Sequence, residues 1–390
     1  MTGRQKGWRL FVALFLLAAA PAIPSSTPFF ALAQDGPPPP PPQPVQRLRR
    51  VRDAPPKTPA STRAQRDSGQ ASQVDDDEVV RVDTELANIL LTAIDKDRRF
   101  VTTLRQEDVR VLEDNVPQEL SIFQRETDSP LTLAILIDTS RSQTAILPNE
   151  KSAARAFIDA VVRPDRDQSS IISFTGEAVL EQPLTNEVAK LRGAIERVKT
   201  ELLPGDPLCE GNVSTEREPR CWTGVWDAVW VTVDQVLSQT PEQARRAIII
   251  LTDGDDTSSQ TNKQEAIDFA LRHNVVVYSI GMRDEEFPDG KMDRGALRKV
   301  SEKTGGRAFF PKDESELRAA FAQIQQELRS QYLIAYRPAN TKHDGSFRQV
   351  RIEIVNPELR KQKLQLLYRQ GYYARSAPAS TTPAAESRPK

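Results

Sequence analysis

Continuous apolar runs alternate with amphipathic stretches through the middle of the chain. Residues 133–137 and 247–251 are uninterrupted apolar runs, typical of strands buried on both faces. Stretches rich in apolar residues at 170–174, 275–280 and 308–310 predict further strands. Helical spacing marks the stretches between them, at 150–162, 186–199, 223–237, 266–271, 295–303 and 314–329. Strands that alternate with helices predict an α/β domain over 128–330, with a mainly parallel sheet covered by helices on both sides.

The flanks of this domain show a period of two instead. Val80 and Val82 alternate with polar residues, and similar short patterns recur over 78–127 and 331–374. Isolated hairpins are marginal in water, and the two ends of a compact domain are often close together. We therefore expect both β segments to join in one β-rich, sandwich-like unit beside the α/β domain.

The first residues have the character of an export signal. Arg4, Lys6 and Arg9 precede the apolar run 10–20, and 31–33 offers a small-x-small cleavage pattern. We expect a signal peptide over 1–33 and a periplasmic or extracellular protein without a membrane span after cleavage; an uncleaved anchor is the alternative. The proline-rich stretch 34–77 is expected to be a disordered linker in polyproline II or coil form, and 375–390 a disordered tail.

Composition narrows the possible functions. The 390 residues carry 53 Lys and Arg against 54 Asp and Glu, a net charge of −1, which argues against a nucleic-acid partner. Two histidines and two cysteines disfavour a His-rich zinc site and exclude a site of four thiolates. In an exported protein, Cys209 and Cys221 are expected to form a disulfide that stabilises the fold by about 3 kcal/mol. Two free thiols are the alternative.

Candidate metal ligands follow the buried strands. In an open parallel sheet, ligands bind beyond the carboxyl ends of the strands. Two aspartates and three hydroxyl residues stand at such ends or at the start of the helix between them. Oxygen ligands of this kind suit Mg²⁺ or Mn²⁺, and the small number of carboxylates leaves room for an acidic side chain of a partner protein. The five candidates are Asp138, Ser140, Ser142, Thr223 and Asp253.

These residues resemble the metal-ion-dependent adhesion site (MIDAS) of von Willebrand factor type A (VWA) domains. The resemblance implies a Rossmann-like fold over roughly 130–330, with the two serines and Thr223 as direct ligands. One departure is Arg141, where many members have glycine. The flanks resemble a bacterial subgroup of secreted VWA-related proteins, which has an acidic turn, here 113–115, and a Gly-Tyr-Tyr-Ala motif, here 371–374.

Three functions are compatible with this pattern. The leading one is an adhesion or protein-interaction module that binds a partner through Mg²⁺. The second is an envelope assembly or structural factor whose metal site is degenerate and whose β region makes the contacts. The third, a metal-dependent hydrolase, is disfavoured because no nucleophile and base pair is evident. We therefore expect no enzymatic activity and no catalytic residue.

Overall fold

The computed structural model of the protein describes residues 46–48, 86–126, 129–200, 223–241, 244–283 and 292–376. The expected signal peptide, most of the proline-rich linker, both cysteines and the tail from residue 377 onward lie outside the described residues. Among the residues that are described, no helix is both long and apolar enough to traverse a bilayer.

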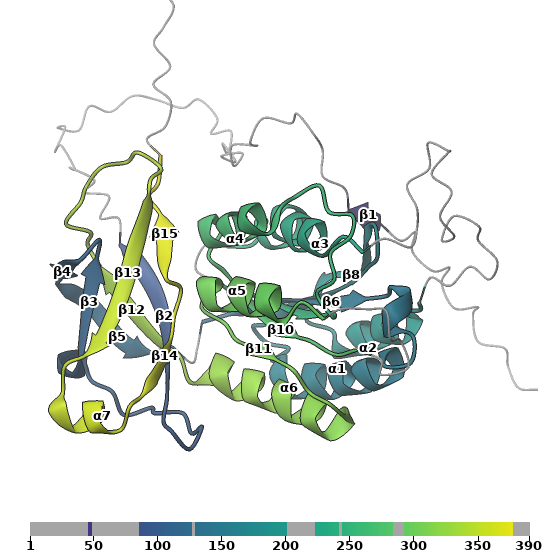
Figure 1. Cartoon of the computed structure of the whole chain (residues 1–390), viewed down its shortest axis with the longest axis horizontal. Coiled ribbons are helices and arrows are strands. Elements are labelled where there is room, and N and C mark those ends of the chain that lie inside the picture. Colours follow the sequence, from purple (N-terminus) through teal and green to yellow (C-terminus); the bar gives the residue numbers. More distant parts are fainter. Residues whose placement is uncertain are drawn as a thin grey trace, which may run out of the picture. The chain divides into compact units, whose positions relative to one another are not determined.

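A seven-stranded sheet, counted over the described residues, forms the centre of the α/β domain (Figure 1). Its strand order is β1-β8-β7-β6-β9-β10-β11, and the pairs from β7 to β11 are parallel. Strands β8 and β1 are antiparallel to their neighbours. The predicted mainly parallel sheet is therefore confirmed. The strands are β1 (Gln46–Leu48), β6 (Leu131–Asp138), β7 (Gln168–Phe174), β8 (Ala178–Thr185), β9 (Arg245–Leu251), β10 (Val275–Ile280) and β11 (Ala308–Phe309).

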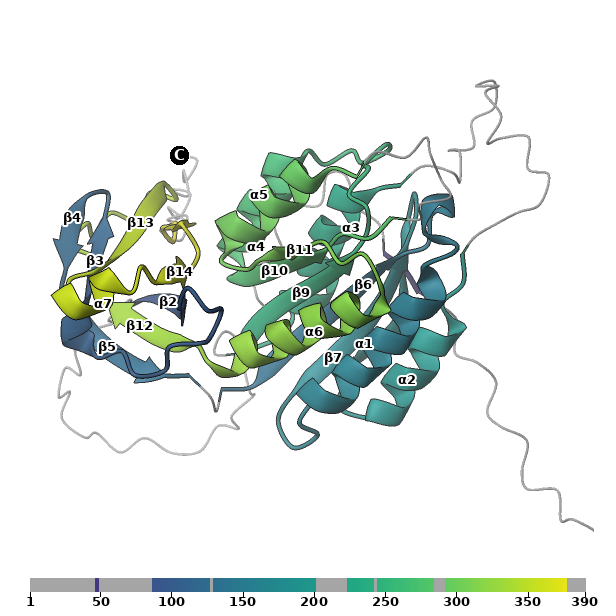
Figure 2. The same cartoon turned by 60° about the horizontal axis from the view of Figure 1, so that its bottom comes forward.

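Helices cover both faces of this sheet (Figure 2). Leu133, Ile135 and Ile137 of β6 pack in one core with α1, α2 and α6, whereas Ala134 and Leu136 pack in another core with α3, α4 and α5. Because successive side chains point to opposite faces, a strand between two helix layers must be apolar throughout. The helices are α1 (Leu147–Val161), α2 (Val188–Arg197), α3 (Val225–Thr232) with a π-helical continuation (Val233–Leu237), α4 (Lys263–Arg272), α5 (Arg294–Thr304) and α6 (Glu314–Arg329).

The two β flanks form one unit, as expected. Strand β12 pairs with both β2 and β5, and β13 pairs with β3. The described residues of this unit form two four-stranded antiparallel sheets, β14-β2-β12-β5 and β15-β13-β3-β4. Its bounds are β2 (Ala87–Ile94), β3 (Val109–Glu113), β4 (Val116–Gln118), β5 (Leu120–Arg125), β12 (Tyr332–Tyr336), β13 (Phe347–Ile354), β14 (Gln365–Leu367) and β15 (Gly371–Tyr373), with a short helix α7 (Pro357–Lys361).

The acidic turn and the Gly-Tyr-Tyr-Ala motif meet inside this unit. Glu113 is 2% exposed, and its Oε2 accepts hydrogen bonds from the hydroxyls of Tyr372 at 2.7 Å and Tyr336 at 3.0 Å. Arg348 pairs with Oε1 of Glu113 at 3.3 Å. A buried carboxylate needs such partners, because burial without them is costly. The glutamate and the first tyrosine therefore form one buried polar cluster.

The second tyrosine of the motif contacts the α/β domain. The guanidinium of Arg272, in α4, lies 3.6 Å from the ring centroid of Tyr373. Nearby, the Nζ of Lys303 donates to Oε1 of Gln370 at 2.7 Å, and the backbone N–H of Gln370 donates to the carbonyl of Lys303 at 3.3 Å. Residues 370–373 thus connect the β unit with α4 and α5.

Two strands at one end of the sheet were not expected from the sequence. Residues 46–48 pair with β8, so the prediction of coil across 34–77 is wrong at these positions. Leu48 is 3% exposed and packs in the core beside β8, and Arg47 pairs with Glu177 at 3.0 Å. An edge strand presents unpaired backbone donors and acceptors, and these three residues satisfy part of that edge.

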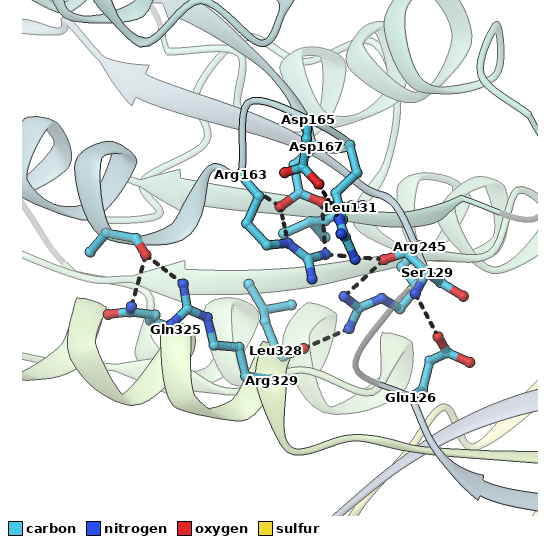
Figure 3. A network of polar contacts seen from close by, with 12 residues as sticks. Glu126, Ser129, Leu131, Arg163, Asp165, Asp167, Arg245, Gln325, Leu328 and Arg329 are labelled. Carbon is cyan, nitrogen blue, oxygen red and sulfur yellow. Dashed lines mark hydrogen bonds and ion pairs between the residues drawn. The ribbon is translucent and has the colours of Figure 1, made fainter.

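A polar network joins the two segments in which the chain passes between the β unit and the α/β domain, from β5 to β6 and from α6 to β12 (Figure 3). Arg245, the first residue of β9, donates to the carbonyl of Leu328 at 2.6 Å and to that of Ser129 at 3.3 Å. Arg163 pairs with Asp167 at 2.7 Å and donates to the same Ser129 carbonyl at 3.3 Å. Ser129 lies on the path into β6, and Leu328 lies near the end of α6, before β12. The buried Arg245 therefore hydrogen-bonds to both connecting segments.

Replacing Arg245 by methionine is expected to lower the free energy of unfolding by about 2–4 kcal/mol, because it removes a buried guanidinium and its hydrogen bonds to the carbonyls of Leu328 and Ser129. The exposed Arg329, which donates to the carbonyl of Ala160 at 2.6 Å, provides the control. Arg329→Met should change stability by less than about 0.5 kcal/mol. Urea unfolding of both variants measures the difference, and equal midpoints would show that Arg245 does not hold the junction.

Candidate metal centre

The site begins at the carboxyl end of β6. Asp138 is fully buried, and its two oxygens are held in different ways. Oδ1 accepts the backbone N–H of Ser140 at 2.9 Å, and Oδ2 accepts the hydroxyl of Thr252 at 2.6 Å. Because β6 and β9 are parallel neighbours, with Ile137 opposite Leu251, the residues that follow them are adjacent. The sheet register therefore fixes the orientation of the Asp138 carboxylate.

The two serines of the motif lie side by side. Their Oγ atoms are 3.2 Å apart, at the start of a 3-10 turn, Arg141–Gln143, that leads to α1. The amide of Gln143 lies 3.4 Å from the Oγ of Ser142 and can donate to it. Arg141, where many VWA domains have glycine, is exposed, so its bulk does not fill the buried part of the site.

Asp253 supplies the second carboxylate from the end of β9. It is 2% exposed; Oδ1 accepts the backbone N–H of Asp255 at 3.1 Å, and Oδ2 has no hydrogen-bond partner within the described residues. Its negative charge acts on Asp138. The two aspartates therefore form one buried acidic pair with an unused acceptor.

Thr223 stands in the turn before α3. Its backbone N–H donates to the hydroxyl of Thr257 at 2.9 Å, and its carbonyl accepts the N–H of the same residue at 2.9 Å. The next N–H, that of Gly224, donates to the carbonyl of Thr175 after β7 at 2.6 Å. These bonds tie Thr223 to the loop that follows Asp253. Within the described residues its hydroxyl makes no hydrogen bond to the other four candidates, and the hydrogen bonds among the candidates join Asp138, Ser140 and Ser142.

Burial dominates the electrostatics of Asp138. The pKa of Asp138 is raised to about 7: burial is the largest cause and the charge of Asp253 acts in the same direction, whereas hydrogen bonds from Ser140 and Thr252 act against them. Removing a carboxylate from water disfavours its charged form, and a neighbouring carboxylate adds repulsion. A divalent cation between the two aspartates would offset both effects.

Some of the other buried oxygens without partners belong to the segments around this pair. Within the described residues, neither carboxylate oxygen of Glu150 has a hydrogen-bond partner, and the same holds for Oε1 of Gln143 and Oγ of Ser258. Most buried polar atoms in proteins are paired, and a cluster of exceptions points to an ion or water at the site. The donor set consists of oxygens alone, which suits a hard divalent cation. The residues therefore fit the predicted metal.

Glu150 was not among the candidate site residues identified from the sequence. It lies in the first turn of α1, is fully buried, and is affected by the charges of both aspartates. Its spacing to Ala154, Phe157, Ile158 and Val161 follows the buried face of the helix, which is the signal that marks it. Across the described residues, no three His, Cys, Asp or Glu side chains gather as a ligand group, so serine and threonine hydroxyls are needed to complete the site.

Comparison with known proteins supports the fold. Residues 215–324 match the family model described as von Willebrand factor type A domain. This stretch contains Thr223 and Asp253 but begins after the first motif, 138–142. A search of curated proteins found no significant match.

Several solved structures are similar at low identity. A von Willebrand factor type A protein from Catenulispora acidiphila is 13% identical, with a TM-score of 0.42 over 76% of this chain and 75% of that one. BatB, a conserved hypothetical protein from Bacteroides thetaiotaomicron, is 18% identical, with a TM-score of 0.39; the match covers 50% of this chain and 98% of BatB. Proximal thread matrix protein 1 from the mussel byssus, with a zinc-occupied MIDAS motif, is 16% identical, with a TM-score of 0.43; the match covers 56% of this chain and 50% of the mussel protein. These TM-scores are low, and the three likenesses carry no functional inference.

The family match and the parallel sheet between two helix layers agree with the resemblance found in the sequence. On this basis, the chain contains a von Willebrand factor type A domain.

Proposed function

We propose that the protein is an exported adhesion or protein-interaction module that binds a partner through a divalent cation, Mg²⁺ or Mn²⁺. The proposed ligands are Asp138, Ser140, Ser142, Thr223 and Asp253. The observation that carries the proposal is the unpartnered Oδ2 of Asp253 in a buried pair with Asp138, beside two adjacent serine hydroxyls. Only a cation offsets two buried negative charges and accepts electron pairs from all these oxygens.

Each residue has a distinct part in this site. The Thr252 hydroxyl orients the carboxylate of Asp138, and the turn after β6 places the two serine hydroxyls next to each other. The bound ion would supply a positive centre with a coordination position left for a carboxylate of the partner protein. Two charged and three neutral ligands do not cancel that positive charge fully, so an acidic side chain remains attracted to it.

Export and the bacterial secreted subgroup belong to the same proposal. The contact between Tyr372 and Glu113 gives a structural reason for the joint presence of the two subgroup motifs. Export also favours a disulfide between Cys209 and Cys221, which lie outside the described residues. A linked peptide pair in a non-reducing digest of protein purified from its native compartment tests that bond, and two alkylated thiols would exclude it.

Binding of envelope proteins in the presence and absence of metal tests the proposed function. The protein without residues 1–33 is immobilised and exposed to envelope extract with Mg²⁺ or with a chelator. We expect partners that are retained with Mg²⁺ and eluted by the chelator. Partners retained equally in both conditions would contradict the adhesion-site proposal and favour the structural factor with a degenerate site. Turnover of a generic ester or phosphoester substrate would instead favour the hydrolase.

A further inference from the structure

Glu150 is an exception among the buried glutamates that the structure describes. Three others, Glu113, Glu126 and Glu327, each accept at least one hydrogen bond from a named donor. Glu150 is as buried as Glu327, yet neither of its carboxylate oxygens has a hydrogen-bond partner in the part of the chain that the structure describes. A buried carboxyl group without hydrogen bonds is costly, so its persistence calls for donors other than the protein atoms that the structure describes.

Glu150 does not act as a helix cap. Asp293 and Asp313 show the usual arrangement: each precedes a helix and accepts a backbone N–H from its first turn, at 2.7 and 2.8 Å. Glu150 lies inside α1, its own N–H donates to the carbonyl of Ile146 at 3.1 Å, and its side chain accepts no backbone N–H. Stabilisation of the helix end therefore does not account for it.

The position of Glu150 points to the metal centre. It lies in the first turn of α1, which follows the turn carrying Ser140 and Ser142, and the charges of Asp138 and Asp253 both act on it. The described residues hold no group of three acidic or other classical ligands, which argues against direct coordination by all three carboxylates. Mg²⁺ usually keeps several waters, and each water carries two hydrogen-bond donors.

We propose that Glu150 is a positioning residue of the metal centre, whose carboxylate accepts hydrogen bonds from the waters of the bound cation. The inference rests on the metal site of the proposed function and adds a third carboxylate to it. Partners of this kind, which bind the ligands of a metal rather than the metal, typically contribute 10–100-fold to affinity, so about that loss is expected when the charge of Glu150 is removed.

The test uses calorimetric titration of Mg²⁺ and Mn²⁺ into the full chain, with melting curves of the metal-free proteins in parallel. Glu150→Gln keeps the shape and removes the charge, and we expect its Kd for Mg²⁺ to rise about 10–100-fold. Its metal-free form should melt at or above the temperature of the wild type, because a buried negative charge near two others is gone. A purely structural role would change melting and leave the Kd unaltered.

Glu327→Gln is the matched control. Glu327 is equally buried but pairs with Tyr278 and Arg307, at 2.9 Å each. This variant should be less stable and should bind Mg²⁺ like the wild type. An equal loss of affinity in both variants would show that affinity follows stability, and would overturn the role of Glu150.

The outcomes separate the two proposals. If the wild type binds Mg²⁺ and Glu150→Gln binds it within about twofold, the role of Glu150 is wrong and the metal site stands. If the wild type binds no divalent cation, the metal site is wrong and this inference falls with it. Should Glu150→Gln fail to fold, Glu150→Asp replaces it, because it keeps the charge but withdraws it by one methylene. An unchanged Kd in that variant also overturns the proposal.

Discussion

Replacing Asp138 by asparagine is expected to abolish Mg²⁺ binding and to raise the melting temperature of the metal-free protein. The carboxylate is fully buried, and burial together with the charge of Asp253 raises its pKa to about 7. Asparagine keeps the shape and can still accept the N–H of Ser140, but it removes one of the two charges that a cation needs. Affinity should fall by at least about 100-fold.

The increase in stability follows from the same burial. An ionised carboxylate in this position opposes folding in the absence of a cation, because it has left water and lies near a second carboxylate. A gain of about 1 kcal/mol corresponds to about 2–4 °C for a domain of this size. Most substitutions of buried residues destabilise a protein, so an increase is a distinctive result.

Calorimetric titration and melting curves measure both effects in one preparation. Asp255→Asn is the matched control: it removes an exposed carboxylate two residues after Asp253 and keeps the backbone N–H that Asp255 donates to Oδ1 of Asp253. It should leave the Mg²⁺ affinity close to that of the wild type. Equal binding by wild type and Asp138→Asn would show that Asp138 is no metal ligand. A large drop in melting temperature would instead assign Asp138 a structural role through Thr252.

The central strands could be predicted from the sequence because their burial leaves no ambiguity. Residues 133–137 and 247–251 are apolar at every position, and the structure places them as neighbours with helices on both faces. The motifs that follow them could also be predicted to meet, because parallel neighbours end at the same edge of a sheet. For these strands, the local pattern of apolar residues was sufficient to predict the secondary structure.

The end of the sheet could not be predicted in the same way. Strand β8 contains Glu181, Gln182 and Pro183, which locally favour a turn over a strand. Its pairing with β7 fixes it as a strand despite that composition. Residues 46–48 follow a proline run and are only three residues long, and they become a strand because β8 offers them an edge. In both cases tertiary pairing outweighs local propensity.

The sequence proposes the ligands of the candidate site but not their surroundings. Asp138, Ser140 and Asp253 stand at strand ends and form a motif, whereas Glu150 is a single acid at the start of an amphipathic helix. Such an acid is ordinarily exposed or caps the helix, and no pattern of sequence shows that it has lost all hydrogen-bond partners. The proposed role of Glu150 depends on how α1 packs, and in the sequence only the spacing of the apolar residues of α1 indicates that packing.

Deleting residues 331–390 is expected to unfold the N-terminal strands of the β unit. Strand β12 pairs with β2 on one side and with β5 on the other, and Tyr332, Ile334 and Tyr336 are buried in the shared core. Without it, two strands lose their common neighbour and the apolar face becomes exposed. Isolated strand pairs are marginal in water, so the loss should be complete rather than partial.

Limited proteolysis with trypsin measures this loss, because Arg98, Arg99, Arg105, Arg110 and Arg125 lie along the affected segment. The truncated protein should be cut within 87–125 much faster than the intact one, since cleavage requires locally unfolded chain. Deleting only 377–390, which lies beyond β15 and its contact with Arg272, is the matched control and should leave the protection intact. Full protection of 87–125 in the longer deletion would mean that β2 to β5 fold without their C-terminal partners. In that case each flank would fold by itself, and the pairing of the N-terminal with the C-terminal strands would not be needed for either to fold.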